Sequence, residues 1–206
     1  MQSSPPAFQI AISYEKKIPE QIISHFISDI STPGLDVRSE ARELGPNAGV
    51  EWYIPTALII FIGKSYFDSF LKEMGKEHYH LLKKGIISLW KYFFGNKRKF
   101  KFNIVSSKGK ASAAPEYSIA LSLMTDLPGK YRIKYLFKDN LSKDDFEKAI
   151  EHLFNFLDNL SAGVIDPEIK QQLQNTKAVG RTILLTYDGK LKILNPIPEG
   201  NAKKKT

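Results

Sequence analysis

Alternating apolar and polar side chains recur along this 206-residue chain, and this period of two limits the possible folds more than any other feature of the sequence. Successive side chains of a strand point to opposite faces of a sheet, so the alternation predicts strands with one buried face and one open face. Because these strands are not continuously apolar, we expect a sheet with core on one side only. The alternating segments are residues 7–14, 35–43, 99–104, 117–123 and 131–138.

Two short turns extend the predicted sheet. Asp188-Gly189 separates the apolar segments 181–187 and 190–194, and Asp-Gly in this position is a strong signal for a β-hairpin. Leu127-Pro128-Gly129 makes a similarly short connection between the alternating segments on either side of it. Strands that follow one another in sequence tend to pair, so we expect the sheet to be mostly antiparallel.

Apolar residues three and four positions apart predict helices between the strands. The pattern covers residues 18–30, 142–163 and 166–176. Ser142, with Asp145 three residues later, fits a helix N-cap, because a hydroxyl there accepts a hydrogen bond from a free backbone N–H.

A longer helical pattern runs over residues 55–94, with a break expected near Gly63. Its second part carries one apolar stripe, which predicts one long amphipathic helix. Gly75 and Gly85 interrupt this helix at a cost of about 1 kcal/mol each relative to alanine. They therefore indicate a bend or a close contact with a neighbouring backbone.

The order of these elements predicts an α+β fold, with a sheet of about five to seven strands and the helices packed on one face. Apolar residues make up 42% of the chain and charged residues 25%, the balance of an ordinary globular domain. We expect residues 1–199 to form a single domain and residues 200–206, which carry three lysines, to be a disordered basic tail.

The sequence shows no signal for export or for insertion into a membrane. The first six residues are polar and proline-bearing, unlike a secretory signal. The most apolar run, residues 52–62, is shorter than the roughly 20 residues that a spanning helix needs. These observations predict a soluble cytoplasmic protein, and they leave open whether residues 52–63 lie in the core or in an interface.

Positive charge is concentrated in one part of the chain. The formal net charge is +8, and residues 72–110 alone hold eleven basic and two acidic residues. Outward lysines and arginines of the strands that follow would share a sheet face with this stretch if those strands pair. The predicted binding surface consists of Lys97, Arg98, Lys99, Lys101, Lys108, Lys110, Arg132, Lys134 and Lys138.

Three kinds of partner fit such a surface. An acidic protein partner would be attracted by the positive field. Nucleic acid would be bound through its phosphates, but the aromatic residues alternate inward, opposite the lysines, and no RNA- or DNA-binding motif is present. An anionic membrane would suit residues 80–101 as a basic amphipathic helix, although the same stripe is what a core helix needs.

Small residues on the open sides of the strands leave room for a flat partner or for a second copy of the chain, so a homo-oligomer is a further expectation. These residues are Ala11, Ser13, Ser118, Ala120 and Ser122.

No catalytic motif is recognised. The chain has no cysteine, which excludes a thiol nucleophile, a disulfide and a cysteine-ligated metal. No nucleophile elbow, phosphate-binding loop or dinucleotide fingerprint occurs. Glu77 and His80 form a Glu-x-x-His pair, but a di-metal site needs a second pair, which is missing. His78 lies on the apolar stripe and is expected to be a satisfied core or interface residue.

We therefore expect no enzyme activity, no metal and no cofactor. The sequence favours a non-enzymatic protein-binding module that docks an acidic partner through a basic surface. Inhibitors and immunity proteins are one class of such small domains, an inference from class alone. A nucleic-acid-binding domain using residues 83–110 and the sheet face is the alternative, and peripheral membrane association is a further one.

Overall fold

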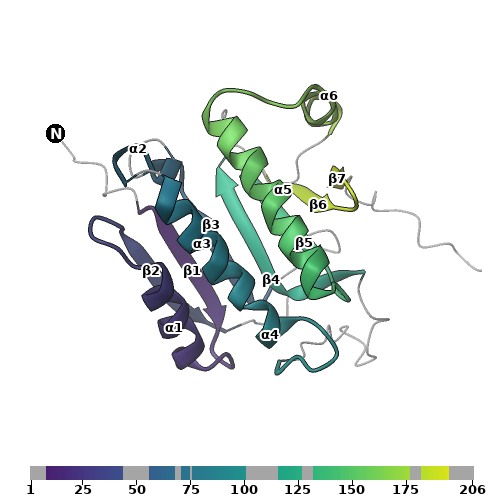
Figure 1. Ribbon diagram of the computed structural model, residues 1–206. Coiled ribbons are helices and arrows are strands. Elements are labelled where there is room, and N and C mark those ends of the chain that lie inside the picture. Colours follow the sequence, from purple (N-terminus) through teal and green to yellow (C-terminus); the bar gives the residue numbers. More distant parts are fainter. Residues whose placement is uncertain are drawn as a thin grey trace, which may run out of the picture.

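One seven-stranded sheet with helices over one face makes up the part of the chain described by the computed structural model (Figure 1). That part comprises residues 8–43, 56–67, 71–74, 76–100, 116–126, 132–176 and 182–194. The strands are β1 (Ile10–Glu15), β2 (Val37–Arg42), β3 (Leu58–Ile62), β4 (Tyr117–Asp126), β5 (Arg132–Lys138), β6 (Thr182–Tyr187) and β7 (Leu191–Leu194). The helices are α1 (Glu20–Ile30), α2 (Leu71–Met74), α3 (Lys76–Ser88), α4 (Trp90–Phe93), α5 (Lys143–Ser161) and α6 (Pro167–Asn175).

The sheet is mixed, with the strand order β2-β1-β3-β4-β5-β6-β7, so the expectation of a mostly antiparallel sheet is wrong. The pairs β1–β2, β3–β4 and β5–β6 are parallel, and β1–β3, β4–β5 and β6–β7 are antiparallel. Each parallel pair is joined through helical residues, which allow the chain to return in the same direction. Alternation of side chains assigns them to the two faces of a sheet, but it carries no information on strand direction.

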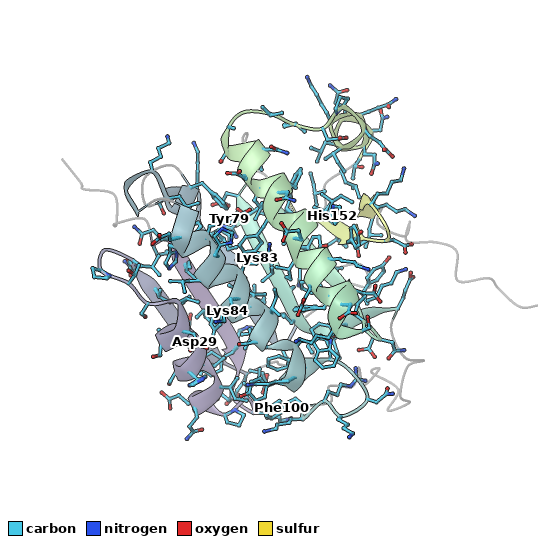
Figure 2. All side chains as sticks on the ribbon, in the orientation of Figure 1. Asp29, Tyr79, Lys83, Lys84, Phe100 and His152 are labelled. Atoms are coloured by element: carbon cyan, nitrogen blue, oxygen red, sulfur yellow. The ribbon has the colours of Figure 1, made fainter. Side chains whose placement is uncertain are left out.

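The core lies between the sheet and the helices α1, α3 and α5, which run side by side in Figure 1. Ile10, Ile60 and Tyr135 point from the sheet into this layer, and Phe26 and Phe146 meet them from the helices. On α3, the ring of Tyr79 contacts Phe154 of α5 at 4.8 Å between centroids, and Lys83 forms an ion pair with Glu151 (Figure 2). The expected α+β fold with helices on one face is therefore confirmed.

Residues 58–62 form strand β3, near the middle of the sheet, where the sequence predicted the start of a helix. Leu58, Ile60 and Ile62 are buried towards the helices, and Ile59 and Phe61 are half-buried on the other face. A short apolar run with both faces shielded has no alternation, so periodicity cannot distinguish it from a buried helix. The described part of the apolar run thus belongs to the sheet of this chain.

The expected long amphipathic helix is not confirmed. Among the described residues of that segment, the helical parts are the separate elements α2, α3 and α4. The longest, α3, has the predicted amphipathic character, with Leu82 and Ile86 buried and Lys84 exposed.

Local signals elsewhere in the chain are confirmed. The hydroxyl of Ser142 accepts a hydrogen bond from the Asp145 N–H at 3.1 Å and caps α5. Gly189 has φ +73° in the turn between β6 and β7, a conformation that favours glycine. Most of the strand predicted over residues 99–104, the turn at 127–129 and the tail at 200–206 lie outside the described residues.

Gly85 marks a close contact between α3 and α1, one of the two interpretations drawn from the sequence. A Cβ atom at this position would lie 2.7 Å from Ile30 Cγ2 and 3.2 Å from Phe26 Cε2. Replacing Gly85 with valine is therefore expected to lower the free energy of unfolding by about 1–3 kcal/mol, because a well-packed interface resists extra atoms.

Urea denaturation followed by circular dichroism measures this loss. Gly85→Ala is expected to cost less, since the gain in helix propensity offsets part of the steric strain. Lys84→Val is the control, because it places the same β-branched side chain on the exposed side of α3. Equal stability of Gly85→Val and Lys84→Val would contradict the close contact.

Candidate functional site

The described part of the basic stretch ends in a reversal of the chain that begins within α4. We name residues 91–99 the basic turn. Both Lys99 N–H and Phe100 N–H donate to the backbone oxygen of Tyr92 at 3.1 Å, so the chain folds back onto α4. Lys91 and Lys99 place their Nζ atoms 4.9 and 5.4 Å from the centre of the Tyr92 ring. These lysines and Lys97 are exposed, and the turn therefore presents three cations in a small area.

Two anchors hold the basic turn in place. The indole Nε1 of Trp90 donates to the backbone oxygen of Leu141 at 3.1 Å, and Arg98 forms an ion pair with Asp139 at 2.9 Å. Both contacts tie the turn to the connection between β5 and α5. Gly95 permits the reversal, since its φ is +73° and a Cβ atom there would lie 2.8 Å from the Trp90 ring. The backbone that carries these lysines is thus held against the connection between β5 and α5.

The predicted binding-surface residues do not form one continuous patch in the described residues. Lys97 and Lys99 lie in the basic turn. Arg98 is engaged with Asp139, and Lys138 contacts Asp188 at 2.6 Å, a hydrogen bond that holds the pKa of that carboxyl below its usual value. Arg132, at the other end of β5, pairs with Asp126 at 3.2 Å. Lys101, Lys108 and Lys110 lie outside the described residues.

Lys134 is fully buried, with 0% of its surface exposed, so its predicted place on an exposed surface is wrong. It points to the helix-free face of the sheet, as the alternation predicts, between Met124 of β4 and Leu184 of β6. Burial, and then the positive charge of Arg42, lower the pKa of Lys134 to about 7. Alternation assigns a side chain to a face of the sheet but does not show whether that face is covered.

A polar network on the helix-free face was not foreseen. Arg42 donates through Nε to Ser13 Oγ at 2.7 Å and through Nη2 to Thr56 O at 2.6 Å. The hydroxyls of Thr56 and Ser122 are 2.6 Å apart. The residues come from β2, β1, the approach to β3, and β4, so only the strand order brings them together.

The network also corrects the expectation of a flat, open surface of small residues. Ser118 and Ser122 are 0% exposed and Ala120 is 5% exposed. Only Ala11 and Ser13, nearer the β2 edge, are half-buried rather than buried. Of these five positions, the accessible ones on the helix-free face therefore lie on β1.

Among the described residues, hollows open on the surface at two places near these side chains. One of about 420 Å³ lies on the helix-free face, with Ile59 and Phe61 in its lining beside Arg38 and Glu40. The other, of about 630 Å³, lies where β5 ends, next to the basic turn. Its ionisable lining residues are Glu116, Lys138, Asp139, Asp145, Tyr187 and Asp188. Acidic and basic groups thus lie side by side at this end of the molecule, linked by the Arg98–Asp139 pair.

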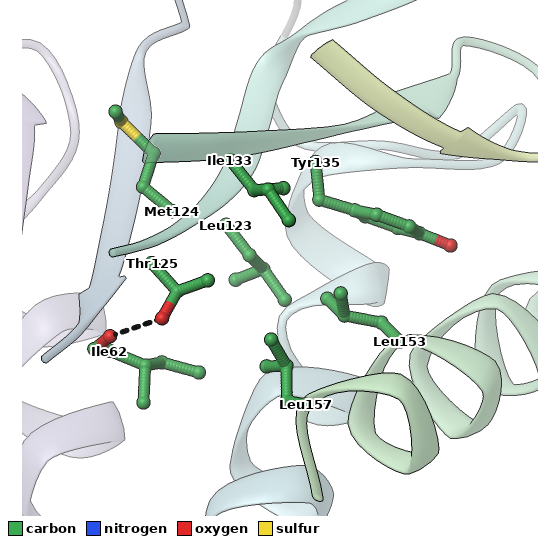
Figure 3. Close-up of a pocket in the computed structure, with 8 residues that line it drawn as sticks. All are labelled: Ile62, Leu123, Met124, Thr125, Ile133, Tyr135, Leu153 and Leu157. Atoms are coloured by element: carbon green, nitrogen blue, oxygen red, sulfur yellow. Dashed lines mark hydrogen bonds between the residues drawn. The ribbon is translucent and has the colours of Figure 1, made fainter. Parts of the chain in front are cut away.

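A cavity under α5 is part of the core rather than a site. It has a volume of about 10 Å³ and is lined mostly by apolar side chains, including Leu123, Leu153 and Leu157 (Figure 3). The Thr125 hydroxyl in its wall already donates to Ile62 O at 2.8 Å. This space is about the size of one water molecule, too small for a substrate.

The histidines and acids do not form a metal centre within the described residues, where no group of three or more histidine, aspartate or glutamate side chains is arranged to hold an ion. His78 is a satisfied core residue, as expected: its Nε2 lies 2.6 Å from Ile30 O and its Nδ1 lies 3.0 Å from the Tyr66 hydroxyl. Glu77 and His80 are exposed on α3.

No helix in the described ranges has the length and apolar character needed to cross a bilayer. The chain matches no protein-family model, no curated protein and no solved structure.

Proposed function

We propose that the protein is a non-enzymatic binding protein that docks an acidic protein partner through the basic turn. The observation that supports this proposal most is the state of Lys91, Lys97 and Lys99. All three are exposed, and no carboxylate of the described residues lies within ion-pair distance of them. Cations that are held in place and that no carboxylate of the described residues neutralises favour association with a complementary negative surface.

The acidic hollow beside the basic turn favours a protein over a nucleic acid. A phosphate backbone following the turn would come close to the carboxylates in the lining of this hollow, including Glu116 and Asp145, which would repel it. A folded protein can place acidic groups on the lysines and basic or neutral groups near the hollow. In addition, Lys91 and Lys99 both lie against the Tyr92 ring, which leaves little of it free for stacking a base.

The membrane alternative loses support because apolar side chains of α3 and α4 are already buried in the core. Leu82, Ile86 and Phe93 are buried in the core, and the Trp90 indole is bonded to the backbone of Leu141. A helix lying in a membrane interface would need these side chains to be free.

Affinity purification with the immobilised full chain tests the proposal, using an extract of the native source with and without nuclease. The test variant carries Lys91→Glu, Lys97→Glu and Lys99→Glu. We expect the wild type to retain one stoichiometric protein partner and the variant to bind it at least about 100-fold more weakly, because like charges placed opposite one another cost several kcal/mol. Titration of the purified partner then measures the two dissociation constants.

The control carries the same three changes elsewhere, at the exposed residues Lys143, Lys148 and Lys170 of α5 and α6. It has the same net charge as the test variant, and we expect it to bind like the wild type. Equal weakening in both variants would show a general charge effect and overturn the basic turn as the docking site. Recovery of nucleic acid that disappears with nuclease would favour the nucleic-acid alternative.

A further inference from the structure

Strand β2 forms one edge of the sheet, and its side chains are largely exposed on both faces. Ser39 and Ala41 are exposed towards the helix side, and Arg38 and Glu40 are exposed on the helix-free side. Within the described ranges β1 is its only neighbour. An edge of this kind presents backbone groups that can pair with another strand.

The register with β1 shows which backbone groups of β2 face outward. Ile10 N–H donates to Asp36 O at 3.1 Å, and Lys16 N–H donates to Arg42 O at 3.0 Å. The even-numbered residues of β2 therefore bond to β1 along the parallel register. Because backbone groups alternate between the two sides of a strand, the N–H and C=O of Val37, Ser39 and Ala41 point away from the sheet.

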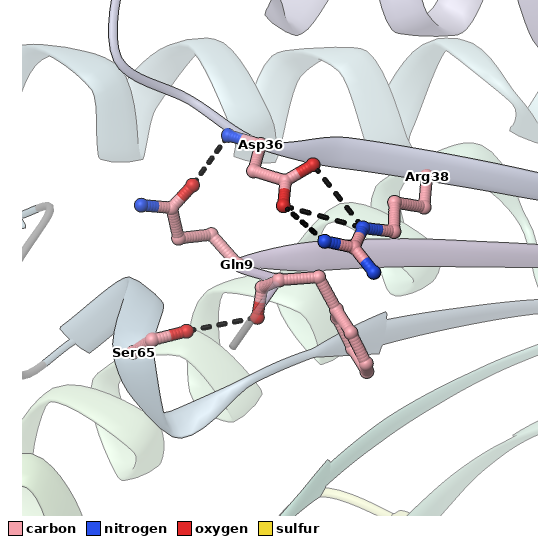
Figure 4. A network of polar contacts seen from close by, with 5 residues as sticks. Gln9, Asp36, Arg38 and Ser65 are labelled. Carbon is pink, nitrogen blue, oxygen red and sulfur yellow. Dashed lines mark hydrogen bonds and ion pairs between the residues drawn. The ribbon is translucent and has the colours of Figure 1, made fainter. Parts of the chain in front are cut away.

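The start of β2 is held in its extended form before any partner arrives. The side-chain amide oxygen of Gln9 accepts a hydrogen bond from Asp36 N–H, and the Asp36 carboxylate accepts three more from Arg38, at 2.9, 3.2 and 3.4 Å (Figure 4). The Ser65 hydroxyl holds the segment just before β1 by donating to Phe8 O at 2.8 Å. A preordered edge loses little conformational entropy when a second strand is added.

We propose that β2 pairs antiparallel with β2 of a second copy of this chain, with the two-fold axis at Ser39. The two seven-stranded sheets then form one continuous sheet. In this register Ser39 lies opposite Ser39 of the second copy, and Val37 lies opposite Ala41 of the second copy. Arg38 lies opposite Glu40 of the second copy, and the symmetry repeats that pair.

Charge selects this register over its neighbours. Centring the pair on Arg38 would place two arginines face to face and Asp36 opposite Glu40. Centring it on Glu40 would place two glutamates face to face and Arg38 opposite Arg42. Of these three registers, only the one centred on Ser39 sets opposite charges across from each other, which stabilises a cross-strand pair, whereas like charges destabilise it.

Hydrogen bonding selects the same register independently. With the axis at Ser39, all three outward residues of each strand face an outward residue of the other. In the registers centred on Arg38 and on Glu40, one of the three outward residues lies opposite a residue outside β2 of the second copy. An edge that only prevented aggregation would carry charges of one sign, whereas the alternating signs here repel in the two neighbouring registers and attract in the register centred on Ser39.

Sedimentation velocity of the full chain over a range of concentrations tests the proposal. We expect a concentration-dependent dimer for the wild type. Arg38→Glu makes both cross-strand pairs negative, and Glu40→Arg makes both positive. For each variant alone, the dissociation constant of the dimer should therefore rise about tenfold or more. An equimolar mixture of the two variants should recover the dimer, because its two pairs are again of opposite sign.

Glu147→Arg on α5 is the control for net charge, and we expect it to leave the dimer unchanged. A wild type that stays monomeric at all concentrations would overturn the proposal. So would single variants that still dimerise, or a mixture that does not recover, since each result would place the contact elsewhere.

The absence of cysteine from the chain allows a direct test of the axis. Opposed residues in a hydrogen-bonded antiparallel pair have Cα atoms about 5.5 Å apart, within the range of a disulfide. Ser39→Cys should therefore give a covalent dimer on mild oxidation. Ser28→Cys, exposed on α1, is the control and should give little. Equal cross-linking of both variants would reflect random collision and contradict the proposed axis.

Discussion

Raising the pH from 7 towards 10 is expected to increase the free energy of unfolding of this protein, because of Lys134. The pKa of this lysine is about 7 in the folded chain and near 10.5 when the chain is unfolded. Between these values the unfolded state holds a proton that the folded state lacks, so stability rises with pH. The slope for one such group reaches about 1.4 kcal/mol per pH unit.

Urea denaturation at pH 6, 7, 8 and 9 measures the slope. Lys134→Met removes the titrating amine and should flatten the curve, and Lys84→Met, on the exposed side of α3, should leave it as in the wild type. Below pH 7 the amine of Lys134 is protonated in both the folded and the unfolded state, so its contribution to the slope vanishes. Burial raises the pKa of Tyr66 and Tyr117, so their effect above pH 10 has the opposite sign. Parallel curves for wild type and Lys134→Met would contradict a buried lysine of low pKa.

His78→Ala is expected to lower the free energy of unfolding by about 2–4 kcal/mol, because buried polar groups lose hydrogen bonds and a cavity remains. A backbone oxygen can only accept, so Nε2 of His78 donates to Ile30 O, and Nδ1 shares a hydrogen bond with the Tyr66 hydroxyl. This ring thus joins the end of α1 to α3 and to the segment after β3.

Thermal unfolding gives the readout, and the midpoint should fall by roughly 6–12 °C for a chain of this size. His80→Ala, two residues further along α3 and exposed, is the matched control and should change stability by less than about 0.5 kcal/mol. Equal stability of the two variants would contradict the role of the buried ring.

Features set by near neighbours in sequence could be predicted, and features set by strand order could not. The Ser142 cap and the Gly189 hairpin depend on a few consecutive residues, and both were found where expected. Strand β3 was misread as helix, because an apolar run shielded on both faces has no characteristic period. The parallel pairs likewise leave no trace in the alternation of the strands.

The same distinction holds for the candidate site. Two lysines of the basic turn, Lys97 and Lys99, were among the predicted surface residues because they are close together in sequence, whereas Lys91 was not. The Arg42, Thr56 and Ser122 network was missed, because its members are brought together only by the order β2-β1-β3-β4. The burial of Lys134 depends on that order too, since Met124 and Leu184 flank it from neighbouring strands.

The strand order also bears on how the protein forms during synthesis. Every strand after β1 is placed beside a strand that has already been made: β2 and β3 on the two sides of β1, and then β4 to β7 one after another. Contacts between segments close in sequence form faster than distant ones. The sheet can therefore grow from β1 in the direction of translation, with no early strand waiting for the C-terminal end of the chain.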